Sequence, residues 1–275
     1  MILGYNTNGF AHHEPKQALE ILAEMGYRSV ALTLDHGLLN PFKTDLPREI
    51  DEMRRTLRRL EMRSVIETGA RFLLDPFQKH EPTLVSADPA ARTRRIAFLC
   101  RAIDIAAELQ SDCVSFWAGT VRDHAPDETA WQRLVDGLRP VIQHATQRGV
   151  TLGFEPEPGM FIDTMRRYDE LLSRIDAPCF QLTLDVGHLH CLGETPIADY
   201  IRRYASRLVN VHIEDMRAGV HNHLQFGDGE MDFPPIIAAL REIHYPGGLH
   251  VELSRHSHEA PTAARHARDF LMPFI

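Results

Sequence analysis

Four residues of this sequence carry side chains that bind metals or move protons, and they recur at comparable intervals. They are Glu155, Asp185, His212 and Glu252, separated by 30, 27 and 40 residues. If folding brings them together, the three carboxylates repel one another unless a cation lies between them. Oxygen-rich ligands with one nitrogen suit Mn²⁺, which is the ion we expect, and also Co²⁺, Mg²⁺ or Zn²⁺.

Each of the four residues falls at or near the end of a short segment with strand-like composition. Eight such segments occur, at residues 2–6, 29–35, 63–68, 113–117, 151–155, 181–185, 209–212 and 249–253. Between them lie amphipathic stretches that predict helices at 15–25, 47–60, 90–109, 129–148, 165–175, 196–207, 234–244 and 261–271. Strands that alternate with helices indicate parallel pairing through helical crossovers.

Eight strand–helix units over one chain of 275 residues predict an α/β protein with a single (β/α)₈ TIM barrel spanning residues 1–275. An open doubly wound sheet is the alternative, but no glycine-rich nucleotide-binding motif follows any expected strand. In such a barrel the strand ends meet at one rim, where catalysis takes place. The last four strands would therefore deliver Glu, Asp, His and Glu to that rim. For any single member, a charged residue that only caps the next helix is the competing interpretation.

Composition narrows the class of partner. The chain has 30 Lys and Arg against 38 Asp and Glu, a formal charge of −8, with no basic block. This balance argues against a protein that binds the nucleic-acid backbone. No apolar run reaches the ~20 residues of a membrane span. The first residues lack the pattern of a signal peptide, and the four cysteines form no CxxC pair. We therefore expect reduced thiols and a cytoplasmic protein.

Histidine is over-represented toward the end of the chain. Ten of the 16 histidines lie from His188 onward. Histidine is the commonest protein ligand of transition metals, so this surplus also points to metal binding.

The motifs around the last four strands resemble the xylose-isomerase-like barrel superfamily. They read FEPEPG, LTLDVGH, VNVHIEDMRAG, HLQFGDGEMDF and LHVEL. That superfamily includes sugar epimerases of the tagatose 3-epimerase kind, hydroxypyruvate isomerase, inosose dehydratase and, more distantly, endonuclease IV. The resemblance implies that Glu155, Asp185, His212 and Glu252 hold one divalent metal. It also implies that His188 and Arg217 bind substrate oxygens. Glu157, two residues past Glu155, is a separate candidate that would contact the substrate or support a ligand, and a simple loop carboxylate is the competing interpretation.

The activity implied by the resemblance is isomerisation or epimerisation of a sugar, sugar derivative or small hydroxy-keto compound. Glu155 and Glu252 would act as the acid/base pair, one removing a proton to form an enediolate and the other returning it. The family also makes a homodimer or homotetramer plausible. An enediolate can instead expel a β-hydroxyl, so a metal-dependent dehydratase or lyase is the first alternative. A sugar-binding barrel without catalysis is disfavoured by the intact set of ligands.

A second metal site stays open in the segment after the seventh strand. In the endonuclease IV branch, two ligands spaced two residues apart lie in this region and join the matching histidine around a further zinc. The resemblance thus makes His188, His221 and His223 candidate ligands of a second ion, and a multi-zinc phosphodiesterase the second alternative. The competing interpretation leaves His221 and His223 solvated or bound to substrate hydroxyls.

Overall fold

Eight parallel strands close into a barrel in the computed structural model, which describes residues 1–275. The strands are β1 (Ile2–Asn6), β2 (Ser29–Thr33), β3 (Arg63–Glu67), β4 (Val114–Phe116), β5 (Leu152–Phe154), β6 (Phe180–Asp185), β7 (Leu208–Ile213) and β10 (Gly248–Val251). Each pairs with the strand before and after it in this order, and β1 pairs with β10 to complete the ring. The predicted (β/α)₈ fold is confirmed.

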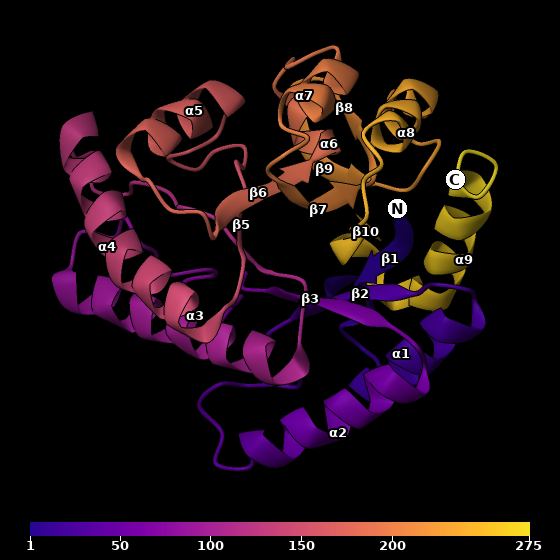
Figure 1. Ribbon diagram of the computed structural model, residues 1–275, viewed down its shortest axis with the longest axis horizontal. Coiled ribbons are helices and arrows are strands. Elements are labelled where there is room, and N and C mark those ends of the chain that lie inside the picture. The colour runs from indigo at the N-terminus through magenta and orange to yellow at the C-terminus, as the bar shows by residue number, and fades with distance from the viewer.

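Nine α-helices follow or connect these strands, most of them on the outside of the barrel (Figure 1). They are α1 (Pro15–Glu24), α2 (Leu46–Arg59), α3 (Pro89–Leu109), α4 (Asp127–Arg148), α5 (Met165–Arg174), α6 (Val186–Cys191), α7 (Ile197–Arg203), α8 (Phe233–Glu242) and α9 (Ala260–Leu271). Two 3₁₀ helices, η1 (Thr7–Phe10) and η2 (Ser254–Glu259), follow β1 and β10. Proline in the first turn starts α1, α2, α3, α8 and α9, where its missing N–H costs nothing.

The segment after β7, for which the sequence predicted no strand or helix before residue 234, is partly regular. It forms an antiparallel hairpin of β8 (Asp215–Arg217) and β9 (Val220–Leu224), which turns through Gly219 at a φ of +72°. The signal was present in the alternation of VHNHL, because residues two apart in a strand project from the same face. His221 and His223 therefore share one face of β9 and do not lie in an irregular loop.

Inside the barrel, polar side chains pack closely around the buried His250. Its Nε2 lies 2.9 Å from Oγ of Ser29, and its Nδ1 lies 2.8 Å from Oδ1 of Asn210. The imidazole is fully buried, and burial lowers its pKa to about 3, so the ring is neutral at pH 7. Gly4 on β1 leaves room for this ring, because a β-carbon at that position would collide with it.

We expect Gly4→Ala to destabilise the barrel by about 1–3 kcal/mol, because the added methyl group forces His250 out of its hydrogen bonds. Urea unfolding followed by far-ultraviolet circular dichroism measures this change. Gly37→Ala is the matched control, since a β-carbon added at that position meets no atom within 4 Å. Equal stability of the two variants would contradict a tight fit around His250.

Candidate active site

The four residues singled out by their spacing meet at the rim of the barrel. Glu155 directly follows β5, Asp185 ends β6, His212 lies near the end of β7 and Glu252 directly follows β10. One ligand atom from each lies within 4.8 Å of the others. Nδ1 of His212 is 3.1 Å from Oε1 of Glu155, 2.9 Å from Oε2 of Glu252 and 4.0 Å from Oδ2 of Asp185. The arrangement has the size and donor types of a divalent-metal site.

His212 is held in this orientation by Glu67 at the end of β3. Oε1 of Glu67 lies 2.9 Å from Nε2 of His212 and also accepts a hydrogen bond from Nδ2 of Asn210 at 3.2 Å. A carboxylate on the far nitrogen fixes a ligating imidazole and makes it more basic. Glu67 falls within the predicted strand at residues 63–68, but no local pattern indicates its contact with His212, which spans the barrel.

One oxygen of Asp185 favours a cation in the site. Oδ1 caps the start of α6 by accepting the N–H of His188 at 2.9 Å. Oδ2 is buried and has no hydrogen-bonding partner in the protein. On the opposite wall Nδ2 of Asn8, which follows β1, donates to Oε1 of Glu252 at 2.7 Å. Because an unpartnered buried carboxylate oxygen is unfavourable, the donor set fits a bound metal ion.

Burial and neighbouring charges shift the pKa values of Glu155 and Glu252 in opposite directions. Burial raises the pKa of Glu155 to about 8. Although burial also opposes the charged form of Glu252, His212 holds the pKa of that carboxyl below its usual range. Burial lowers the pKa of His212, but the carboxylates of Glu155 and Glu67 outweigh it and raise the pKa well above its usual value. Two glutamates whose pKa values differ in this way suit acid/base chemistry, in which one gives and the other takes a proton.

The other predicted site residues fall into two groups. His188, His221, His223 and Glu157 all line the cavity that contains the four donors. Desolvation raises the pKa of Glu157 well above its usual value, whereas burial lowers the pKa of His188 to about 4 and keeps that imidazole neutral. Arg217 lies on β8 with an exposed side chain whose Nη2 donates to the carbonyl of Asp228 at 2.9 Å. It is not among the residues that line the cavity.

The cavity has a volume of about 230 Å³, and only one of its lining residues, Trp117, is hydrophobic. The guanidinium of buried Arg95 lies 4.6 Å from the centre of the Trp117 ring and supports that wall. Three cationic side chains, those of Arg71, Lys79 and Arg255, also face the cavity. Nothing in the sequence alone pointed to Lys79 or Asn8.

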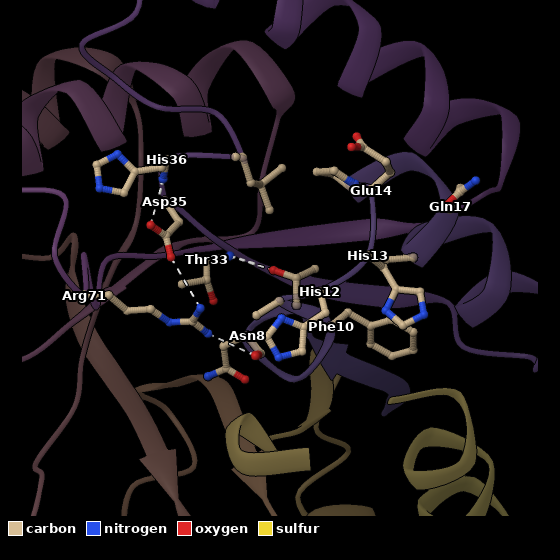
Figure 2. Close-up of a pocket in the computed structure, with 16 residues that line it drawn as sticks. Asn8, Phe10, His12, His13, Glu14, Gln17, Thr33, Asp35, His36 and Arg71 are labelled. Atoms are coloured by element: carbon tan, nitrogen blue, oxygen red, sulfur yellow. Dashed lines mark hydrogen bonds and ion pairs between the residues drawn. The ribbon is translucent and has the colours of Figure 1, made fainter. Parts of the chain in front are cut away.

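A second, larger cavity adjoins the first between the segments that follow β1 and β2 (Figure 2). Its volume is about 580 Å³, and it shares Asn8, Thr33 and Arg71 with the cavity of the four donors. Arg71 lies at the boundary, where its Nη2 donates to the carbonyl of Asn8 at 3.0 Å and its Nη1 is 3.4 Å from Oδ2 of Asp35. The two cavities together enclose a larger volume than a single metal ion would occupy.

None of the helices combines the length and the apolar character needed to cross a membrane.

Known proteins share this fold and parts of this sequence. A family model described as xylose isomerase-like TIM barrel matches residues 19–274. An inosose dehydratase from Clostridium beijerinckii is 33% identical over 143 residues, which are 46% of this chain and 48% of that protein. The match thus spans about half the length of that relative. An L-ribulose-5-phosphate 3-epimerase from Salmonella typhi is 26% identical over 93% of this chain and 88% of its own.

Among solved structures, a D-psicose 3-epimerase from Clostridium cellulolyticum H10 superimposes with a TM-score of 0.79. The two sequences are 20% identical, and the superposition covers 100% of this chain and 99% of the other. At that identity the likeness concerns the fold.

Proposed function

The chain belongs to the xylose isomerase-like TIM barrel family, and from this membership we propose that it is a divalent-metal-dependent isomerase or epimerase of a sugar or sugar derivative. The observation that carries the proposal is the meeting of Glu155, Asp185, His212 and Glu252 around one point in a polar cavity. The 3-epimerases among its relatives and structural neighbours support the same class of reaction.

The reaction that we propose removes a proton from one face of a carbon atom and adds another proton to the opposite face. A divalent ion held by the four residues would supply a Lewis acid for the carbonyl and adjacent hydroxyl of a ketose, which acidifies the C–H bond beside the carbonyl. One glutamate, Glu155 or Glu252, removes that proton, and the C–H electron pair forms the enediolate. The other glutamate returns a proton to the opposite face of the same carbon, which inverts it.

Isomerisation between aldose and ketose would use the same two carboxyl groups. The proton then returns to the former carbonyl carbon, and the hydroxyl proton moves to the neighbouring oxygen. We propose that the neutral His188 and the half-buried Glu157, both in the cavity, face the substrate oxygens. The role of Arg217 in substrate binding stays a prediction. Its guanidinium would first have to leave the carbonyl of Asp228.

The two cavities indicate how a substrate larger than the reacting carbons would lie in the site. The smaller one encloses the donor set, and the larger one lies beyond Asn8, Thr33 and Arg71. We propose that the reacting carbons occupy the first cavity and that the distant end of the substrate extends toward the second. The identity of the ion as Mn²⁺, the cytoplasmic location and the homodimeric or homotetrameric state stay predictions.

Deuterium exchange tests the proposal directly. Purified protein loaded with Mn²⁺ and incubated with a panel of ketoses in D₂O is expected to introduce deuterium at C3 or C1 of at least one of them, because the enediolate takes its proton from a solvent-exchanged glutamate. Proton NMR follows the loss of the C–H signal. Absence of exchange in every ketose, combined with cleavage of a phosphodiester, would favour the phosphodiesterase alternative and refute the proposed function.

The identity with an inosose dehydratase favours one second candidate, a metal-dependent dehydratase acting on a keto-polyol. The same carboxylates would form the enediolate, and the β-hydroxyl would leave in place of reprotonation. In the D₂O experiment this activity appears as loss of a hydroxyl and water release from an inosose. An epimerase instead gives a product of unchanged mass apart from deuterium.

A further inference from the structure

The two oxygens of the Glu252 carboxylate have different neighbours. Oε2 lies 2.9 Å from Nδ1 of His212, the ring nitrogen that also faces Glu155 and Asp185. Oε1 instead accepts a hydrogen bond from Nδ2 of Asn8 at 2.7 Å. Asn8 lies in η1 after β1, and Glu252 follows β10, the strand that pairs with β1. The closure of the barrel therefore places an amide on one oxygen of Glu252 and an imidazole on the other.

Glu155, the other candidate for acid/base chemistry, has no such amide donor. Its side chain forms one hydrogen bond, in which Oε1 lies 3.1 Å from Nδ1 of His212. Nδ1 of His188 is 3.7 Å from the same oxygen, which is beyond hydrogen-bonding distance. Because the last torsion of a glutamate side chain is broad, a carboxylate without a second partner can turn about it. Asn8 removes that freedom from Glu252 and not from Glu155.

The backbone of Asn8 is held by three other segments of the chain. Its N–H donates to Oδ1 of Asn6, the residue before η1, at 3.1 Å. Its carbonyl accepts from Nη2 of Arg71 at 3.0 Å (Figure 2) and from Oγ of Ser257 at 3.0 Å. Asn6 ends β1, Arg71 lies after β3, and Ser257 belongs to η2 after β10. The turn that carries the amide is thus fixed to the rim of the barrel.

The side chain of Asn8 has a single hydrogen-bonding partner, which is Glu252. An ionised carboxylate only accepts, so the amide must turn its NH₂ group toward Glu252. Oδ1 of Asn8 is then buried without a partner, which is unfavourable for stability. The three contacts that hold η1 in place use backbone atoms of Asn8 and not its side chain. The side chain therefore adds little to the fold, and its one bond points to a role in the orientation of Glu252.

We propose that Asn8 is a positioning residue, which holds Oε1 of Glu252 toward the C–H bond of the substrate. The inference rests on the proposed function and assigns its proton transfer to one oxygen of this glutamate. In the direction in which Glu252 is the base, the proton passes from the carbon to Oε1, and the C–H electron pair stays on the substrate as the enediolate. Oε2 remains beside His212, among the candidate metal ligands. A reacting group displaced by about 1 Å can lose roughly 10²-fold in rate, so loss of the amide slows the transfer.

Steady-state kinetics of deuterium exchange test the role of Asn8. The substrate is the ketose of the D₂O panel that the natural protein exchanges fastest, with Mn²⁺ supplied in excess. We expect Asn8→Ala and Asn8→Asp to lower kcat by about 10- to 100-fold with little change in KM. Asn8→Gln keeps an amide donor and is expected to recover part of the loss. Asn40→Asp is the matched control, because Oδ1 of Asn40 accepts the N–H of Phe42 at 3.0 Å, as a carboxylate also can, and Asn40 lines neither cavity.

The results separate positioning from substrate binding and from metal holding. An unchanged kcat in Asn8→Ala overturns the inference, while exchange by the natural protein leaves the proposed function intact. A rise in KM without a fall in kcat shows that Asn8 binds the substrate, and it also overturns the inference. Loss of bound Mn²⁺ from the variants, measured by mass spectrometry, has the same consequence. If Asn8→Asp unfolds because two carboxylates repel, Asn8→Ala decides, since it removes only the hydrogen bond. Absence of exchange by the natural protein instead refutes the proposed function, and the inference with it.

Discussion

The variant Glu252→Gln is expected to lose deuterium exchange into ketoses by about 10³-fold or more, because an amide neither accepts the substrate proton nor returns one. Glutamine has nearly the same shape as glutamate and retains an oxygen for the hydrogen bond from Asn8, which is now 2.7 Å long. The fold should therefore persist, as circular dichroism would show. Exchange in D₂O, measured by NMR on natural and variant protein under equal Mn²⁺ saturation, gives the ratio.

Varying the metal concentration in this assay separates two roles of Glu252. Glu252 is both a ligand candidate, 2.9 Å from Nδ1 of His212, and an acid/base candidate. If the variant keeps its bound Mn²⁺ and loses exchange, the glutamate moves the proton. If exchange returns to a tenth or more of the natural level once the metal concentration is raised, its role is only to hold the ion, and the acid/base assignment fails. Glu259→Gln, on the exposed side of the following 3₁₀ helix, serves as the matched control.

Removal of the metal is expected to abolish activity and to lower the thermal midpoint by roughly 5–10 °C. The stability part follows from linkage: an ion present at 100 times its dissociation constant stabilises the folded state by about 2.7 kcal/mol. For a chain of this size each kcal/mol shifts the midpoint by about 2–4 °C. Structurally, chelation leaves the carboxylates of Glu155, Asp185 and Glu252 close together without their cation.

Dialysis against a chelator followed by differential scanning calorimetry and the D₂O assay measures both effects. Adding back Mn²⁺, Co²⁺, Mg²⁺ or Zn²⁺ singly then ranks the ions by recovered exchange, and we expect Mn²⁺ to recover the most. A chelated protein that contains no metal and remains fully active would refute metal dependence. The Glu252→Gln protein provides the internal comparison, because its smaller negative charge should reduce the thermal shift.

The residues at the rim of the barrel could be predicted from the sequence because the strand–helix unit of the barrel repeats. Parallel strands joined by helices all end on the same side, so a polar residue at each strand end must reach one rim. Glu155, Asp185 and Glu252 each required only the recognition of a local apolar segment and its last position. The (β/α)₈ fold followed from the same local patterns.

Contacts between segments that are distant in the sequence had no such local signal. Glu67 reaches His212 from β3, a strand that does not pair with β7, and Asn8 reaches Glu252 from the segment after β1. Arg217 was expected in the cavity, but the turn of the hairpin directs it to Asp228. Glu214 and Glu252 are both glutamates near strand ends, and only packing shows that the first is fully buried while the second lines the cavity.

The sequence by itself determined the fold class and the chemical types delivered to the rim, because apolar periodicity and strand-end positions are local properties. The tertiary structure alone decided which of these groups touch. It set Nδ1 of His212 toward the carboxylates and, through the register of β8 and β9, brought His221 and His223 to His188. Those outcomes depend on the closure of the ring and on pairings between distant segments, which no local pattern encodes. Three members of the histidine surplus near the end of the chain thus lie together in the cavity.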